Sequence, residues 1–360
     1  MNLAHKLLDF FYHGYAKGNL ELPYSLMEFV SKYSEYSTET YNIGRYCRIL
    51  EQEGLLLHMG TKGSNPYYRH CYYTNKEIYD KDLSKYGSYD LLVNGFYSVR
   101  ERFSSLCLPI SVKTVNDDYS IGSCFIYDNE TVITARHCIE GEIVKSFQIL
   151  DIESKPIPVE NIYVSSQSFL DVAIIKTQKN YFESFESFVV SSKPDHLGTS
   201  LVDKANFIDS PVFILFGQGK VLDNILTLGY PPISGFESIL IADKSAINSV
   251  FLRSSVGQVL TQQNKIGYWG DDLEYFLINA KVKGGNSGGP VFDNLGRVIG
   301  IVVEIPVDII IKTEIDKLGY GLVVPAKYIK DLMISIKEKD SNCICLKVQS
   351  ENDFSYSIKK

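Results

Sequence analysis

One serine, Ser287, lies in a run of glycines that reads GGNSGGP over residues 284–290. Glycine loses more conformational freedom on folding than any other residue, so four glycines around one hydroxyl indicate a backbone that must approach something closely. A nucleophilic serine needs a general base, and it needs donors for the negative charge that develops on an attacked carbonyl oxygen. Small neighbours allow the N–H groups of Gly285 and Ser287 to turn towards one point. The run therefore indicates acyl-transfer chemistry, with these two N–H groups as an oxyanion hole.

The base of such a site should lie elsewhere in the sequence but close in space. Of the six histidines, His137, in TVITARHCIEG, is the one that ends a β pattern and has small neighbours. The carboxylate that orients the imidazole should lie at the edge of a buried strand, and Asp171, in SFLDVAIIKT, opens such a strand. We predict that His137, Asp171 and Ser287 converge as a catalytic triad.

The elements that must position these residues begin at about Leu106. Short apolar runs alternate there with turn signals, a pattern that is typical of a β-barrel or a β-sandwich. Helical spacing predicts a final helix over 325–339, and the polar residues 341–360 are expected to form a loosely held tail. The long interval before Ser287 indicates an inserted segment near residues 177–222.

The N-terminal part of the chain has a different pattern. Apolar residues at helical spacing predict helices over 3–17 and 22–33, and a third helix that Ser37 or Thr38 caps. A strand, a turn and a second strand follow, which completes a resemblance to the winged helix-turn-helix domain over about residues 1–80. The third helix should bury one face, formed by Ile43, Tyr46, Cys47 and Leu50.

Three motifs, GSCFIYDNETVITARHCIEG, LDVAIIK and GGNSGGP, follow one another in the order His, Asp, Ser. This order resembles the trypsin-like serine proteases, and the match covers about residues 106–338. The HtrA-type branch is the most similar, since GSCFI stands where that branch has a glycine-serine-glycine-phenylalanine run. The resemblance implies a mainly β fold: a chymotrypsin-like double β-barrel with a C-terminal helix, preceded here by a small α+β winged-helix domain.

The resemblance also implies a role for each residue of the site. Ser287 would attack the carbonyl carbon, His137 would act first as general base and then as general acid, and Asp171 would hold the imidazole tautomer. The N–H groups of Gly285 and Ser287 would bind the oxyanion. No metal or organic cofactor is implied.

Substrate preference depends on a second set of residues. Val303, Glu304 and Ile305 should form the strand that pairs with the substrate backbone, and Gly321 is assigned to the same substrate-binding set. A bulky Ile305 would narrow the primary pocket and favour a small or aliphatic residue before the scissile bond. If Lys281 pointed into the pocket, an acidic residue would be preferred instead.

The expected organisation has four parts: a winged-helix-like domain over 1–82, a connector over 83–105, a trypsin-like protease domain over 106–340, and a polar tail over 341–360.

The partner of the N-terminal domain is either DNA or protein. Residues 1–82 hold nine Lys and Arg against ten Asp and Glu, and DNA affinity depends on neutralising phosphates, so protein contact is favoured. The residues that DNA binding would use are Thr38, Thr40, Tyr41, Asn42 and Arg45 in the major groove, with Lys62 and Arg69 near phosphates.

Bulk composition limits the remaining classes. The 360 residues carry a net charge of −7, so the whole chain is not an electrostatic binder of nucleic acid. The seven cysteines are odd in number, which excludes a complete disulfide framework, and Cys124 and Cys138 are expected to be free thiols. The N-terminus makes a poor signal peptide, and no stretch of about 18 apolar residues occurs. We therefore expect a cytoplasmic protein without a membrane segment, and the resemblance to the HtrA-type branch implies a bacterial one.

Two functions follow from these patterns. In the first, the chain is a serine endopeptidase that hydrolyses a protein or peptide substrate, and the winged helix recruits a protein partner or that substrate. In the alternative, it is a DNA-bound transcriptional regulator whose protease domain cleaves itself or a neighbouring protein.

Overall fold

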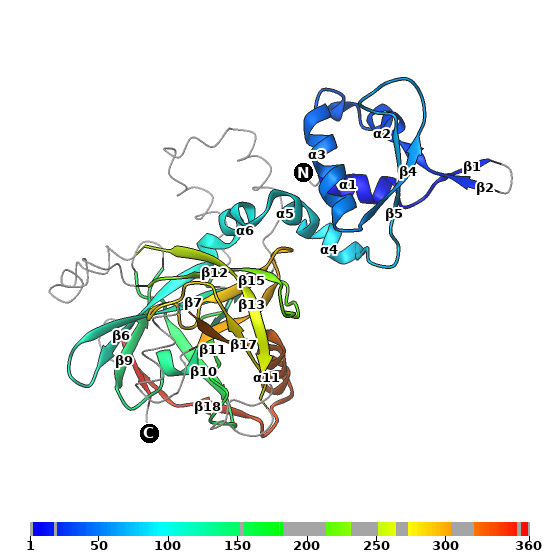
Figure 1. The fold of residues 1–360 in the computed structure, drawn as a ribbon. Coiled ribbons are helices and arrows are strands. Elements are labelled where there is room, and N and C mark those ends of the chain that lie inside the picture. The colour runs from blue at the N-terminus through cyan, green and yellow to red at the C-terminus, as the bar shows by residue number, and fades with distance from the viewer. Residues whose placement is uncertain are drawn as a thin grey trace. The chain divides into compact units, whose positions relative to one another are not determined.

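The structure, a computed structural model, describes residues 3–17, 20–151, 155–179, 181–182, 214–231, 251–263, 273–303, 320–350 and 354–358. The chain divides into two compact units, Met1–Gly95 and Phe96–Lys360 (Figure 1). The expected connector is therefore shared between the units, because its first helices pack within the N-terminal unit and its last helix belongs to the C-terminal unit.

The N-terminal unit combines short helices with a three-stranded sheet. In chain order its elements are α1 (Leu3–Phe10), β1 (Tyr15–Lys17), β2 (Leu20–Leu22), β3 (Tyr24–Ser25), α2 (Leu26–Lys32), η1 (Ser34–Tyr36), α3 (Thr40–Gln52), β4 (Leu56–Thr61), β5 (His70–Thr74), α4 (Lys81–Lys85) and α5 (Ser88–Asn94). The sheet has the order β3-β5-β4 and is antiparallel. This order of helices and strands is the one that a winged helix requires, and membership of that class stays a prediction.

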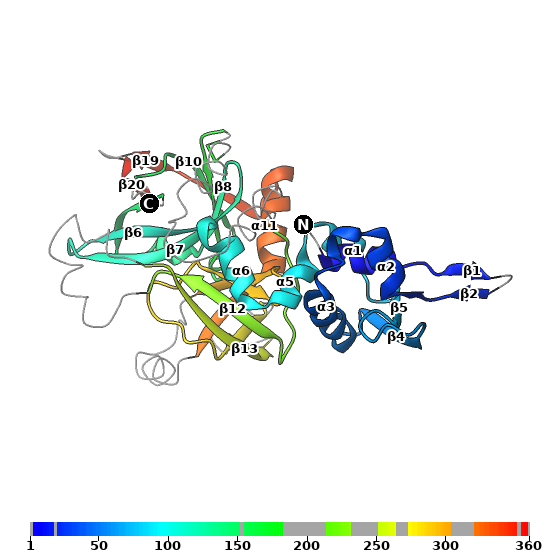
Figure 2. The ribbon, with the colours of Figure 1, turned by 90° about the horizontal axis from the view of Figure 1, so that it is seen from above.

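The first helix is shorter than the sequence pattern predicts. It ends at Phe10, and β1 pairs with β2 as a hairpin that extends away from the rest of the unit (Figure 2). Gly14 explains the break, because a Cβ at this position would overlap the carbonyl oxygen of Leu22, and its N–H donates to the Glu21 carboxylate over 2.6 Å. The third helix buries the predicted face, and its buried residues are confirmed as Ile43, Tyr46, Cys47 and Leu50. The predicted cap at Ser37 or Thr38 is wrong, because the helix begins after Glu39 and no side chain caps it.

The C-terminal unit begins with α6 (Phe96–Phe103) and η2 (Ser104–Leu106) and continues into a nine-stranded sheet of order β18-β10-β11-β8-β7-β6-β9-β20-β19. The strands of this sheet and the short helix within it are β6 (Cys107–Thr114), β7 (Tyr119–Asp128), β8 (Thr131–Thr134), η3 (Arg136–Cys138), β9 (Val144–Ile149), β10 (Val159–Ser165), β11 (Ala173–Thr177), β18 (Cys343–Leu346), β19 (Val348–Ser350) and β20 (Tyr356–Ile358). We call this sheet the N-terminal barrel.

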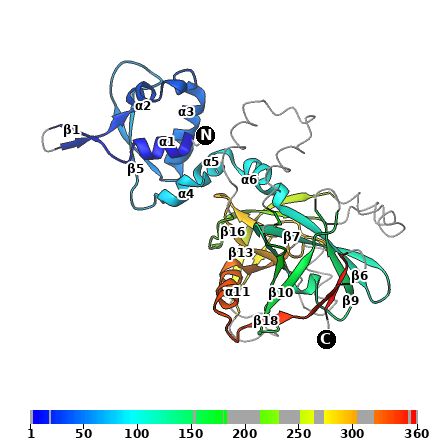
Figure 3. The ribbon, with the colours of Figure 1, turned by 180° about the vertical axis from the view of Figure 1, so that it is seen from behind.

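The C-terminal tail adds strands to both ends of the N-terminal barrel, which corrects the expectation that the tail is loosely held. Strand β18 runs beside β10 (Figure 3), and β20 pairs with β9. Only Lys347 separates β18 from β19, so the two ends of the sheet meet at one residue. The physical reason is that β9 and β10 would otherwise present edges of unpaired backbone groups, which the tail strands satisfy.

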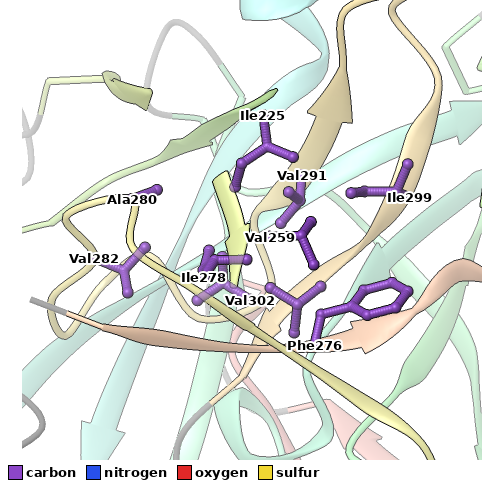
Figure 4. Packing of buried hydrophobic residues seen from close by; sticks show 10 residues of the cluster. Ile225, Val259, Phe276, Ile278, Ala280, Val282, Val291, Ile299 and Val302 are labelled. Carbon is purple, nitrogen blue, oxygen red and sulfur yellow. The ribbon is translucent and has the colours of Figure 1, made fainter. Parts of the chain in front are cut away.

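A second, closed barrel follows, with the strand order β12-β13-β14-β17-β16-β15. We call it the C-terminal barrel. Its strands are β12 (Asn224–Gly229), β13 (Arg253–Gln263), β14 (Tyr275–Ile278), β15 (Pro290–Asp293), β16 (Val298–Val303) and β17 (Gly321–Pro325). Helix α11 (Ala326–Glu338) follows the last strand. A cluster of aliphatic side chains with Phe276 fills the barrel (Figure 4). The expected mainly β, chymotrypsin-like double β-barrel with a C-terminal helix is confirmed.

Among the residues that the structure describes, no helix has the length and apolar character needed to cross a membrane. All seven cysteines are free, and the expectation of free thiols at Cys124 and Cys138 is confirmed.

Candidate active site

Strand pairing brings His137 and Asp171 together. In the antiparallel pair of β8 and β11, Thr134 lies opposite Ala173, so the residues just after β8 and just before β11 lie at the same end of the sheet. One carboxylate oxygen of Asp171 accepts the backbone N–H of His137 over 2.8 Å, and the other lies 2.6 Å from imidazole Nδ1. The carboxylate therefore holds both the backbone and the ring of His137.

Two consecutive tight turns form the loop from β14 to β15 around Ser287, which is the second residue of the second turn. The N–H of Asn286 donates to the carbonyl of Lys283 over 3.0 Å, and the N–H of Gly289 donates to the carbonyl of Asn286 over 2.8 Å. The third residue of the first turn is Gly285, with φ +92°, and that of the second is Gly288, with φ +83°. A positive φ at this position defines a type II turn and selects glycine.

Close packing explains three of the four glycines. A Cβ at Gly285, Gly288 or Gly289 would overlap a carbonyl oxygen of a neighbouring segment. At Gly284, in contrast, no atom lies within 4 Å of such a Cβ. The loop is therefore held by its fit against the surrounding strands, and Gly284 is the glycine whose side of the loop is open.

His137 and Ser287 line one cavity of about 230 Å³. Gly285 lines it as well, and the residues that the structure describes include no hydrogen-bond acceptor for the N–H of Gly285 or of Ser287. The remaining lining residues come from both barrels and are Val112, Ser120, Ile121, Gly122, Cys138, Ile143, Val144, Val282, Lys283, Gly284, Val302, Val303, Tyr320, Gly321 and Leu322.

The charge state of His137 reflects opposing influences. Burial disfavours the charged imidazole, but the adjacent Cys138 sulfur and the Asp171 carboxylate outweigh it, and the pKa of His137 is raised well above its usual value. The Cys138 sulfur lies 3.8 Å from imidazole Nε2, and its S–H donates to the carbonyl of Ser287 over 3.5 Å. The His137 and Asp171 side chains are 30% and 17% exposed, so solvent still reaches the pair.

The residues expected to bind substrate are only partly brought to this cavity. Val303 and Gly321 line it, whereas Lys281 is exposed and is not among the lining residues. Glu304 and Ile305 lie outside the described residues, as does most of the expected insertion. The wall next to Ser287 is apolar, because two members of the barrel core also face the cavity, Val282 and Val302.

Sequence reasoning missed two residues that hold the Ser287 loop. The hydroxyl of Ser123, on β7, donates to the carbonyl of Gly285 over 2.6 Å. Tyr230 donates its backbone N–H to that hydroxyl over 2.9 Å and its own hydroxyl to the carbonyl of Cys107. The available signal was the serine of GSCFI, but only the strand arrangement shows what it contacts.

In the N-terminal unit, most residues expected at a DNA groove have partners within the unit. The Arg45 guanidinium donates to the carbonyl of Val93 and to the side chain of Asn94. The other paired groups are Thr40 with Tyr68, Asn42 with Glu39, and Lys62 with Glu28. Tyr41 is 81% exposed, and Thr38 and Arg69 are exposed too.

Comparison with known proteins agrees with this geometry. Residues 122–301, half of the chain, match the family model described as "Trypsin-like peptidase domain". The chain therefore belongs to the trypsin-like peptidase family. A search of the curated proteins finds no match.

Two solved structures illustrate the similarity of fold. The HtrA-type protease AlgW with a tripeptide is 17% identical with a TM-score of 0.43, and the match covers 68% of this chain and 64% of that one. The Rv3671c protease from M. tuberculosis in its active form is 18% identical with a TM-score of 0.44, and the match covers 66% and 83%. The chain thus spans less than two thirds of the AlgW chain that it matches.

Proposed function

We propose that the chain is a serine endopeptidase that works through His137, Asp171 and Ser287. The observation that carries the proposal is the double hydrogen bond from His137 to Asp171, at the cavity that His137 and Ser287 share. Because a carboxylate can only accept, Nδ1 carries the imidazole hydrogen, and Nε2 is left as the acceptor that a general base needs.

The proposed reaction has two halves. The Ser287 oxygen bonds to the substrate carbonyl carbon while its proton passes to Nε2 of His137, and the carbonyl oxygen takes the negative charge. That oxygen would accept hydrogen bonds from the N–H groups of Gly285 and Ser287. The C–N bond then breaks as His137 gives its proton to the leaving amine. Water attacks the acyl-enzyme with His137 again as base, which releases the acid and restores the serine.

The apolar wall supports a preference for a small or aliphatic residue before the scissile bond. Val282, Val302 and Val303 line the same cavity as Gly285 and Ser287, and Gly321 lies against Val282. No carboxylate is among the lining residues, so the described part of the cavity has no partner for a basic side chain.

Labelling with a fluorophosphonate probe tests the proposal. The wild type should gain one adduct at Ser287 by intact mass and peptide mapping, and Ser287→Ala should gain none. His137→Ala should lose nearly all labelling, since the serine then has no base. Labelling of His137→Ala at the wild-type rate would show that the base is misassigned.

For the N-terminal unit we propose recruitment of a protein partner or substrate. Two strongly exposed aromatic side chains, Tyr41 at 81% and Tyr67 at 68%, suit protein contact, since tyrosine is enriched at interfaces. The internal pairing of Arg45 and Lys62 removes cations that DNA phosphates would need.

A gel-shift assay tests the DNA-bound alternative. Random duplex DNA at low and at moderate salt should give no shift with the full chain. A shift at low salt that weakens as salt rises would instead favour the regulator that cleaves itself or a neighbour.

A further inference from the structure

Ser123 is a fully buried serine of the N-terminal barrel whose polar groups are all hydrogen-bonded. Its backbone N–H donates to the carbonyl of Ser287 over 2.8 Å, and its own carbonyl accepts from the hydroxyl of Thr134 over 2.7 Å. Its hydroxyl accepts from the N–H of Tyr230 and donates to the carbonyl of Gly285. One side chain of one barrel thus contacts the nucleophile loop of the other.

The direction of the hydroxyl bond follows from its partners. A backbone N–H can only donate, so the bond of 2.9 Å from Tyr230 uses a lone pair of the Ser123 oxygen. The carbonyl of Gly285 can only accept, so the single hydroxyl hydrogen points to it, over 2.6 Å. With Ser123 at 0% exposure, no solvent competes for this hydrogen.

These contacts reach Gly285 and Ser287, which line the cavity and whose N–H groups have no acceptor among the described residues. Ser123 binds the carbonyl of Gly285 through its hydroxyl and the carbonyl of Ser287 through its backbone. Between them, Asn286 is buried and closes the first turn. Each of these carbonyls belongs to the peptide group that follows its residue, and each N–H belongs to the peptide group that precedes it. With both carbonyls held, rotation at Gly285 and at Ser287 is restricted from one side, which favours one direction for each N–H before substrate arrives.

We infer that Ser123 is a positioning residue for the oxyanion hole, a role that rests on the proposed peptidase function. Ser123 does not touch the substrate; it acts through Gly285 and Ser287. Its hydroxyl is the part that a substitution can remove while the backbone contact to Ser287 stays.

The structure also indicates that removal of the hydroxyl leaves a folded protein. The N–H of Tyr230 also donates to the carbonyl of Gly285 over 3.3 Å, so in Ser123→Ala these two groups keep each other as partners. Neither is left without a partner, which avoids the main cost of deleting a buried hydroxyl. Without the hydroxyl, the 2.6 Å bond to the carbonyl of Gly285 is lost and only this longer bond holds that carbonyl among the described residues, so the turn and the N–H of Gly285 are held less firmly.

The test compares Ser123→Ala with Ser146→Ala, a serine that is buried in the same barrel, on β9, and does not line the cavity. Loss of a whole oxyanion donor costs about 10²–10³ in rate, so a misdirected donor should lower kcat about 10- to 100-fold with KM nearly unchanged. Affinity for a peptide boronate, whose tetrahedral adduct places an oxygen in the hole, should fall in parallel. Ser146→Ala should match the wild type in each measurement.

Ser123→Cys, which keeps a weak donor of similar size, should lie between Ser123→Ala and the wild type, and it replaces the alanine variant if that one does not fold. Three results would overturn the inference and leave the proposed function standing. They are a wild-type kcat in Ser123→Ala, a change in Ser123→Ala that affects KM but not kcat, and a loss of kcat in Ser146→Ala equal to that in Ser123→Ala. A wild type without any Ser287-dependent turnover would overturn the proposed function, and the inference with it.

Discussion

Asp171→Asn separates the two contacts that Asp171 makes with His137. The backbone N–H of His137 can only donate, so the amide oxygen must replace the carboxylate oxygen that accepts it over 2.8 Å. The amide nitrogen then replaces the oxygen that lies 2.6 Å from Nδ1. Because that nitrogen donates, Nδ1 must accept, and the imidazole hydrogen moves to Nε2. The atom that should take the proton of Ser287 is then already protonated.

The lost charge adds to this effect. Two unit charges 2.6 Å apart attract by about 6 kcal/mol at an effective dielectric constant of about 20, and by about 2 kcal/mol in bulk water. The side chains are 30% and 17% exposed, which places the pair in the lower half of this range, at about 2–4 kcal/mol. That is a factor of about 30 to 10³ for the imidazolium. With the wrong tautomer in addition, we expect a loss of about 10³–10⁴ in kcat/KM.

The assay is the second-order rate of fluorophosphonate labelling, followed by intact mass, which needs no knowledge of the natural substrate. Asp171→Ala is the control, because it removes the charge without imposing a tautomer, and it should be labelled faster than Asp171→Asn. An asparagine variant labelled within about tenfold of the wild type, with an unchanged melting temperature, would refute the reasoning.

The same rates measured against pH test the charge of His137. The base works only when it is neutral, so the wild-type rate should be lost as the pH falls through the raised pKa of His137. Without the Asp171 carboxylate the midpoint should move to lower pH. A midpoint that rises in Asp171→Asn would contradict the assigned electrostatics.

Three further predictions concern stability. Gly288→Ala should lower the free energy of unfolding by about 2–4 kcal/mol in a urea titration, because φ is +83° and a Cβ would overlap the N-terminal barrel. Gly284→Ala, with open space around it, should change that free energy by less than about 0.5 kcal/mol, and equal effects would contradict the packing argument. Burial raises the pKa of Asp90 to about 6, so folding favours the protonated carboxyl and stability falls as the pH rises. Between about pH 4.5 and about pH 7.5 the N-terminal unit should lose about 2 kcal/mol, a loss that should be absent in Asp90→Asn. Deletion of residues 341–360 should lower the melting temperature by about 10 °C or more, since it uncovers β9 and β10. An unchanged melting curve would mean that the tail strands do not stabilise these two edges.

Much of the fold could be predicted because its signals are local. The apolar runs after Leu106 became strands, and the pattern over 325–339 became α11. The first helix was overestimated, because the apolar positions up to residue 15 continue a helical pattern into a hairpin that starts after Gly14. The tail was misjudged for a related reason. Its polar composition describes the face that it exposes, whereas its strands form because neighbouring edges need partners.

The residues of the candidate site also divide into those with a local sequence signal and those whose surroundings depend on distant segments. His137, Asp171 and Ser287 could be selected from the sequence, since each lies in a motif with its own local requirement. The sequence left open whether Lys281 points into the pocket; in the structure Lys281 is exposed and does not line the cavity, whereas its neighbour Val282 joins the barrel core. Arg45, which the DNA-binding alternative would use in the major groove, donates to Asn94, which lies 49 residues further along the chain and which no local pattern connects to it.

By itself, the sequence determined the strand-rich architecture and the turn chemistry around Ser287, because alternation of apolar residues and glycine at positive φ are requirements of single residues and their neighbours. Only the tertiary structure decided which carbonyls Ser123 binds, which strands the tail pairs with, and that Asp171 accepts hydrogen bonds from His137 through both carboxylate oxygens. Those contacts join segments up to 197 residues apart, and their partners exist only once strand order and register have brought distant polar groups within about 3 Å of each other.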